Sequence, residues 1–156
     1  MKYLYKENGK YIFEKSVILN CDIKELFSFH LDTNNLPLIS PPFPKVKLKF
    51  MSDNPLVVNS KIVVNISFFL FSLNWTILIK EIVEPELVVD CQDKGIFEYW
   101  CHSHIFENYK GHVKMIDKVE FLPPYGMLGR LLLPFFFLQL IIMFNYRHKK
   151  TKNLFG

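Results

Sequence analysis

The central part of the chain, residues 45–122, alternates between apolar and polar side chains in short runs that are separated by turn-forming residues. Alternation with a period of two is typical of β-strands, and Asn, Asp, Gly and Pro interrupt it at short intervals. Short connections between successive strands predict an antiparallel meander. The expected strands are 45–51, 60–70, 73–83, 86–93, 97–107 and 112–122.

The segment before this meander predicts one more strand and two short helices. Residues 11–19 are rich in β-branched and aromatic side chains, which favour a strand. Asn20 or Asp22 can cap the first helix, because a short polar side chain can accept from its free backbone N–H groups. A second short helix should end before the prolines of segment 41–44, which cannot continue it.

A long helix is expected after the meander, from Gly126 through about Lys150. Pro134 falls inside it and should leave a carbonyl near Arg130 without a partner, so we expect a bend there that sets the width of any cavity beneath the helix. No linker or repeat interrupts the chain. We therefore expect one domain, residues 1–156, of the α+β class.

Two neighbouring strands carry polar groups on their apolar faces. In 97–107, His102 and His104 share a face with Trp100 and Phe106. In 112–122, Asp117 shares a face with apolar side chains only. A buried carboxylate is costly unless it is paired, so we expect Asp117 to be hydrogen-bonded to His102, with His104 on the same inward face.

The register of this hairpin follows from its turn. If the outer residues of segment 108–111 pair with each other, His102 lies opposite Asp117 and His104 lies opposite Met115. A bulge in the turn would shift this register.

Composition adds a reason to expect a cavity. Half of the residues are apolar, and the 16 Phe residues provide more aromatic surface than the core of so small a domain needs. This surface either lines an internal space or is covered by something else.

The charge pattern argues against nucleic acid. The formal net charge of +4 is modest, and much of the excess lies in one C-terminal cluster rather than in a stripe interleaved with aromatic residues. The cluster consists of Arg147, His148, Lys149, Lys150 and Lys152.

The cysteines indicate a reducing compartment. Cys21, Cys91 and Cys101 are odd in number and widely spaced, which predicts neither a disulfide framework nor a zinc site. The early charges Lys2 and Lys6 leave no apolar stretch of the kind found in a secretory signal. We therefore expect a cytoplasmic protein.

Several segments together resemble a known superfamily. They are Phe27-Ser28-Phe29-His30-Leu31-Asp32, Trp75, Asp90-Cys91-Gln92, Gly95-x-Phe97-x-x-Trp100-x-His102-x-His104-x-Phe106, Asp117-x-Val119-x-Phe121-x-x-Pro124 and Phe144-x-Tyr146-Arg147. This set resembles the START-like (SRPBCC, helix-grip) superfamily, in particular its bacterial ligand-binding branch labelled cyclase/dehydrase-like. One departure is Gly95-Ile96-Phe97, where the family usually has Gly-Pro-Phe.

The resemblance implies a helix-grip fold, in which a curved antiparallel sheet of about seven strands wraps around a long C-terminal helix with a cavity between them. It also implies an apolar small-molecule ligand, such as a lipid, an isoprenoid or an aromatic compound, held in a cavity of about 300–1,000 Å³. The expected ligand-binding residues are Phe29, His30, Trp75, Gln92, Trp100, His102, His104, Phe106, Met115 and Asp117.

An enzyme of the cyclase or dehydratase type is the alternative. His102 or His104 could act as a base oriented by Asp117. A structural His–Asp pair is favoured over this, because no Ser or Cys nucleophile stands beside them in a recognisable motif. Two histidines and a carboxylate also match a metal-ligand set, but His-x-His alone is a weak signal, so we expect neither a metal nor a cofactor.

Membrane association is the third possibility. The run 131–144 is apolar, but its length falls short of the about 20 residues that span a bilayer. An apolar helix beside the basic cluster could instead touch an anionic membrane surface.

Overall fold

A computed structural model, which describes residues 4–156, contains one eight-stranded antiparallel sheet with the order β1-β2-β8-β7-β6-β5-β4-β3. The edge strand β1 pairs with β2, and β2 pairs with the last strand, β8. The strands are β1 (Leu4–Glu7), β2 (Lys10–Leu19), β3 (Lys45–Met51), β4 (Lys61–Ser67), β5 (Ser72–Val83), β6 (Leu87–Lys94), β7 (Tyr99–Tyr109) and β8 (His112–Leu122).

Five helical elements accompany the sheet. Between β2 and β3 lie α1 (Ile23–Leu31), a 3₁₀ turn η1 (Thr33–Asn35) and α2 (Leu36–Ile39); after β8 come α3 (Met127–Leu131) and α4 (Leu133–Phe155). Asp22 caps α1 by accepting from the backbone N–H groups of Lys24 and Glu25, at 2.8 and 3.0 Å. The two short helices and the long terminal helix agree with the expected order.

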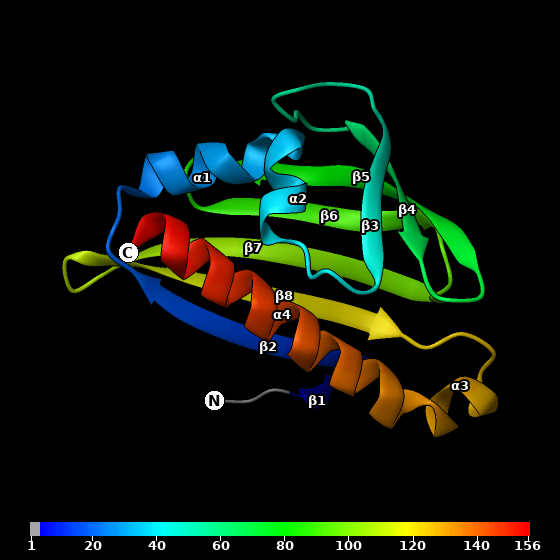
Figure 1. Ribbon diagram of the computed structural model, residues 1–156. Coiled ribbons are helices and arrows are strands. Elements are labelled where there is room, and N and C mark those ends of the chain that lie inside the picture. Colours follow the sequence, from blue (N-terminus) through cyan, green and yellow to red (C-terminus); the bar gives the residue numbers. More distant parts are fainter. Residues whose placement is uncertain (1–3) are drawn as a thin grey trace.

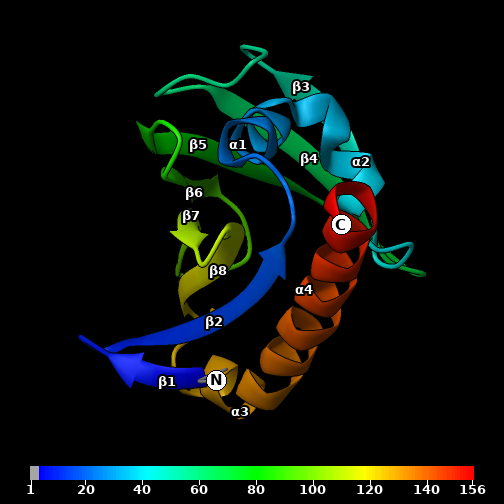
Figure 2. The same ribbon diagram turned by 90° about the vertical axis from the view of Figure 1, so that its left-hand side faces the viewer.

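The sheet curves around α4. In Figure 1, α4 crosses diagonally over one face of the sheet, with α1 and α2 beside it. Figure 2 shows the strands bending away on one side and α4 standing opposite them, with α1 and α2 over one end of the space between. This is the helix-grip arrangement, so the predicted fold class is confirmed.

The core divides into patches under the different helices. One patch surrounds Phe13 and Phe144, where β2 meets α4, and their rings stack with centroids 5.3 Å apart. A second surrounds Phe27 and Phe106, where α1 covers the end of β7. A third lies on β4 and β5 around Ile79. The helices are thus fixed at separate points of the sheet, which leaves room between them.

Strands 45–51 and 112–122 have the predicted bounds, whereas β1 was not predicted. It pairs with β2 through a turn at Asn8 and Gly9, both with positive φ. Asn-Gly favours a two-residue hairpin, so this signal is present in the sequence. The sheet therefore has eight strands rather than about seven.

The predicted register of the β7–β8 hairpin is wrong by two residues. Tyr109 pairs with His112, so the two turn residues are Lys110 and Gly111, at φ 50° and 81°, one position later than expected. His104 therefore lies opposite Asp117, and His102 lies opposite Val119. A shift of two keeps every side chain on its face, so both histidines still point to the concave side.

The terminal helix is interrupted near Pro134, as expected, but by a complete break rather than by a bend within one helix. The helical segment breaks at Leu132, between α3 and α4, and Pro134 lies in the first turn of α4. Backbone N–H groups in a first helical turn have no partner within the helix, so proline is tolerated there. The part of α4 that lies over the sheet continues without a proline from Phe135 to Phe155.

The cysteines differ from expectation as well. Cys91 and Cys101 lie opposite each other on β6 and β7 and form a disulfide on the face of the sheet away from α4. Ten residues separate them in sequence, and only the strand pairing brings them together. The cysteine spacing therefore gives no support for a reducing compartment. Cys21 is free and partly buried.

Within residues 4–156, no helix combines the length and the apolar character that crossing a membrane requires.

Candidate functional site

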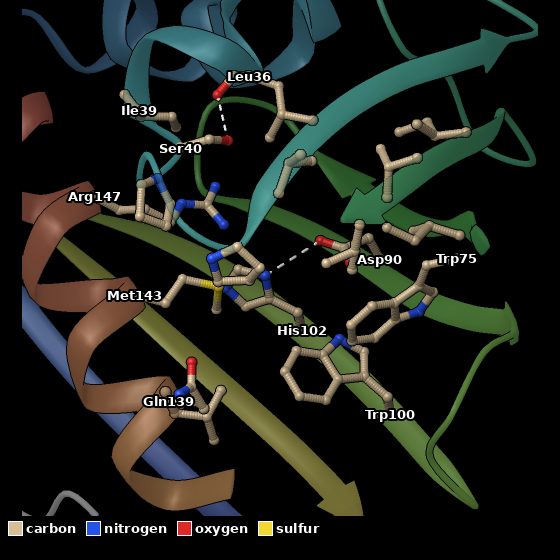
Figure 3. A pocket seen from close by; sticks show the side chains of 18 of the residues that line it. Leu36, Ile39, Ser40, Trp75, Asp90, Trp100, His102, Gln139, Met143 and Arg147 are labelled. Carbon is tan, nitrogen blue, oxygen red and sulfur yellow. Dashed lines mark hydrogen bonds and ion pairs between the residues drawn. The ribbon is translucent and has the colours of Figure 1, made fainter. Parts of the chain in front are cut away.

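A cavity of about 300 Å³ lies between the concave face of the sheet and α4, with η1 and α2 along its border. Figure 3 shows side chains from the sheet, from α2 and from α4 pointing into it. Most of the lining is apolar, including Ile77 and Ile79 of β5 and Leu140 and Met143 of α4. Such a lining suits an apolar molecule, because burying its surface removes apolar area from water.

Six of the ten predicted ligand-binding residues line this cavity: Phe29, His30, Trp75, Trp100, His102 and His104. Gln92, Phe106, Met115 and Asp117 do not. Gln92 instead holds the β6–β7 connection, where its amide donates to the Phe97 carbonyl at 2.8 Å and accepts from the Phe97 N–H at 3.3 Å. Phe97 itself lines the cavity, so Gln92 contributes to it indirectly.

Phe106 and Met115 belong to the core beneath α1. Both are about 1% exposed, and the rings of Phe106 and Phe27 meet edge to face at 5.7 Å. The alternation of β7 and β8 places them on the concave face but does not reveal that α1 covers this end of the sheet. Neither side chain therefore lines the cavity.

The polar part of the site is a histidine–aspartate cluster, defined as Asp90, His102, His104, Asp117 and His148. Three neighbouring strands and α4 contribute to it, since Asp90 comes from β6, both central histidines from β7, Asp117 from β8 and His148 from α4. Asp90, His102 and His104 line the cavity, whereas the other two lie behind them.

Asp117 is the centre of this cluster and is 2% exposed. Its Oδ1 accepts from His102 Nε2 at 2.8 Å and lies 3.0 Å from His104 Nδ1, while Oδ2 accepts from His148 Nε2. Burial alone would raise the pKa of Asp117, but hydrogen bonds from the three histidines outweigh it and hold this pKa well below the usual value. The predicted burial of Asp117 and its bond to His102 are confirmed.

Asp90 faces the same two histidines from the other side. Its Oδ2 lies 3.5 Å from His102 Nδ1 and 3.3 Å from His104 Nε2. Burial again acts to raise the pKa of Asp90, but His102, His104 and Arg147 lower it overall. Each central histidine therefore has a carboxylate at both ring nitrogens.

The two central histidines differ in their affinity for a proton. Burial acts to lower the pKa of His104, but Asp117 and Asp90 together raise it above the ordinary value. Burial lowers the pKa of His102, and the neighbouring His104 lowers it further. Of these two histidines, His104 therefore binds a proton more readily than His102.

His30 completes this end of the cavity from α1. Its Nδ1 donates to the Leu26 carbonyl at 2.8 Å, and its ring lies 5.3 Å from that of His104 between centroids. Burial and the charge on His104 lower the pKa of His30 to about 3. His30 is therefore neutral at neutral pH.

Sequence reasoning missed Asp90, Arg147 and His148 as members of the site. Asp90 lies directly opposite His102 in the β6–β7 pairing, but recognising it requires the register of that pair. His148 follows Phe144 by four residues on α4, so the helical period turns both inward. Arg147 lines the cavity, as Figure 3 shows. In the sequence, Asp90 stands out only as part of the family pattern, His148 only as part of the basic cluster, and Arg147 as part of both.

Comparisons with solved structures support the fold. No family model and no curated protein matches this chain. A protein from Arthrobacter aurescens aligns with a TM-score of 0.72 at 10% identity, covering 94% of this chain and 89% of that one. Protein Ms6760 from Mycobacterium smegmatis aligns with a TM-score of 0.68 at 11% identity, covering 97% and 94%.

A third similar structure is the di-domain ARO/CYC StfQ from the steffimycin biosynthetic pathway, with a TM-score of 0.67 at 9% identity. The match covers 91% of this chain and 50% of StfQ. Identities this low show a shared fold rather than a shared activity. The comparisons thus establish that the chain adopts the helix-grip fold.

Proposed function

We propose that this chain is a START-like (SRPBCC) protein that binds one apolar small molecule in the cavity between the sheet and α4. The observation that carries the proposal is the cavity itself, which is apolar on most of its wall and includes a group of polar side chains formed by Asp90, His102, His104 and Arg147. A ligand with a long or cyclic apolar body and one polar end fits this division. A lipid, an isoprenoid and an aromatic compound all meet that description.

A second polar group supports an oriented ligand. The indole Nε1 of Trp75 is buried and, within residues 4–156, has no hydrogen-bond partner. Trp75 lines the cavity, and a buried donor without a partner costs free energy. A ligand oxygen that accepts from this group would remove that cost.

Native mass spectrometry of freshly purified protein, followed by organic extraction, tests the proposal. We expect a bound species of one ligand per chain that is released into the organic phase. Protein that carries no ligand, and that takes up none from a mixture of fatty acids, isoprenoids and aromatic compounds, would contradict it.

An enzyme of the cyclase or dehydratase type is the second candidate. His104 faces the cavity and has a raised pKa, while Asp117 fixes its ring from behind. A histidine held in this way can exchange a proton with a bound substrate. If the extracted ligand is converted by the protein, and His104→Gln binds but does not convert it, this candidate replaces simple binding.

Membrane contact is proposed through the apolar end of the molecule rather than through the basic cluster. His148 is buried and Arg147 lines the cavity, so only three of the five basic-cluster residues are on the surface. In Figure 1, the β4–β5 connection and α3 both lie at the end away from the C-terminus. Their most exposed apolar side chains are Phe69, Leu70, Phe71, Met127, Leu128 and Leu131.

Vesicle co-sedimentation tests this contact. Leu70 is 97% exposed, so Leu70→Ser should fold normally and bind phospholipid vesicles more weakly. Lys150→Gln, at the other end, is the matched control and should bind like the unchanged protein. Equal binding by all three proteins would contradict contact through the apolar end.

A further inference from the structure

The side of the histidine–aspartate cluster that faces the cavity has the geometry of a metal site. Asp90, His102 and His104 each offer one ligand atom, and these atoms lie within 4.8 Å of one another. Asp90 Oδ2 is 3.5 Å from His102 Nδ1 and 3.3 Å from His104 Nε2. Donor atoms about 2.0–2.2 Å from a tetrahedral ion are separated by about 3.3–3.6 Å. An ion between these atoms would therefore need little movement of Asp90 relative to either ring.

The strands fix the three donors. Asp90 and His102 are paired directly across β6 and β7, and His104 follows two residues later on the same face of β7. The side chains of His102 and His104 are 5% and 10% exposed, and that of Asp90 is 14% exposed. The donors thus come from the interior of a sheet, where neither the backbone nor the rotamers have much freedom.

Asp117 orients both rings for this purpose. His102 Nε2 and His104 Nδ1 face its Oδ1, so each ring has a carboxylate at one nitrogen and directs the other toward Asp90. Metal-bound histidines in proteins typically donate their second N–H to a carboxylate, which fixes the tautomer and raises the basicity of the ligand. Asp117 occupies this supporting position for both His102 and His104, and His148 donates to its other oxygen.

The charges around the cluster leave room for a cation. Asp90 and Asp117 bring two carboxylates to the cluster, and Arg147 also lines the cavity. When His102 Nδ1 and His104 Nε2 carry no proton, their lone pairs face the Asp90 carboxylate oxygen, which is unfavourable unless a cation lies between them. A divalent ion satisfies all three donors at once.

We propose that Asp90, His102 and His104 bind a divalent first-row transition-metal ion, with Asp117 as the carboxylate that orients both histidines. Two imidazoles and one carboxylate suit Zn²⁺, Fe²⁺ and Co²⁺. Three protein ligands leave a coordination position, and it opens toward the cavity because all three line it. This inference does not depend on the identity of the apolar ligand.

The sequence alone pointed away from a metal because His-x-His is a weak signal, and the carboxylate that it offered was Asp117. The structure gives Asp117 the supporting position, and the third donor is Asp90, from a strand whose pairing could not be read from the sequence.

The test is a titration of chelator-treated, dialysed full-length protein with Zn²⁺ by calorimetry, and with Co²⁺ by visible absorption. We expect one ion per chain, a cobalt spectrum typical of low coordination number, and a higher temperature of unfolding with Zn²⁺. Asp90→Asn should weaken Zn²⁺ binding at least 10-fold, and Asp117→Asn about 10–100-fold.

His112→Gln is the matched control, because His112 is an exposed histidine at the β7–β8 turn. It should bind Zn²⁺ like the unchanged protein. No stoichiometric binding by the unchanged protein would overturn the proposal, whether or not the variants fold. So would equal affinity in Asp90→Asn that folds normally by circular dichroism, or a loss of binding in His112→Gln.

Discussion

At the scale of single residues, the site depends on one buried carboxylate that serves three histidines. An apolar residue in place of Asp117 would leave His102, His104 and His148 without the carboxylate that they contact. A buried group left without its partner costs more than the net contribution of the bond. Changes at Asp117 should therefore affect the fold as well as the cavity.

Asp117→Asn tests this dependence. It keeps the shape but removes the charge, and we expect the free energy of unfolding at neutral pH to fall by about 1–3 kcal/mol. Urea unfolding at pH 7 measures it. The exposed Asp93→Asn on β6 is the control and should change little. Equal stability of the two variants would show that the hydrogen bonds to Asp117 contribute nothing.

The half-buried His30 predicts a pH dependence of stability. Its pKa is lowered to about 3 in the fold, whereas an unfolded histidine titrates near 6.5. Between these values the unfolded chain binds the extra proton, so His30 favours the fold fully above about pH 6.5 and loses this contribution as the pH falls.

Unfolding of the unchanged protein and of His30→Gln at pH 7, 6, 5 and 4 measures this effect. The unchanged protein should lose stability more steeply, by up to about 1.4 kcal/mol per pH unit. His112→Gln, at an exposed position, should follow the unchanged protein. Parallel curves for His30→Gln and the unchanged protein would contradict the burial of a neutral imidazole.

At the scale of elements, the short helix α3 depends on a glycine. Gly129 is buried, and a Cβ there would overlap the backbone carbonyl of Pro124. Backbone atoms cannot move aside as a flexible side chain can, so Gly129→Ala should destabilise the fold by about 1–3 kcal/mol and displace α3. Thermal unfolding measures it.

The matched control is Met127→Ala in the same helix, because Met127 is 82% exposed. It should leave the temperature of unfolding nearly unchanged. If Gly129→Ala were as stable as Met127→Ala, α3 would not pack against Pro124 as described.

The elements were largely predictable and their pairing was not. Alternation and turn residues are local signals, and they placed β3 and β8 at their observed bounds. The register of β7 and β8 depends on the dihedral angles at Lys110 and Gly111, which the sequence does not specify uniquely. The Cys91–Cys101 disulfide depends in the same way on the pairing of β6 with β7.

The same limit applies to the site. His102, His104 and Asp117 could be assigned to a shared inward face from the period of two alone, because a two-residue shift preserves it. Identifying Asp90 as a member of the site requires knowing which strand pairs with β7. Recognising that Phe106 is covered requires the position of α1. Contacts between elements distant in sequence are fixed by packing, which no local pattern reports.

At the scale of the whole molecule, the two ends differ: helices cover the sheet at one end, and apolar side chains are exposed at the other. Near the C-terminus, α1 and the end of α4 cover the sheet, and Phe29 of α1 packs edge to face against Phe155 of α4 at 5.1 Å. Toward α3, the chain presents exposed apolar side chains, and Phe68 and Phe135 line the cavity. The exposed apolar side chains thus adjoin residues that line the cavity.

The measurement that tests the central claim most directly compares two tryptophan substitutions on β5. Ile77 lines the cavity, whereas Leu78 points to the opposite face, beside Cys91. Titration with an environment-sensitive apolar fluorophore should show one site per chain in the unchanged protein and in Leu78→Trp. Ile77→Trp fills the cavity and should bind at least 10-fold more weakly while remaining folded by circular dichroism. If folded Ile77→Trp binds the fluorophore as tightly as Leu78→Trp, the cavity is not the binding site.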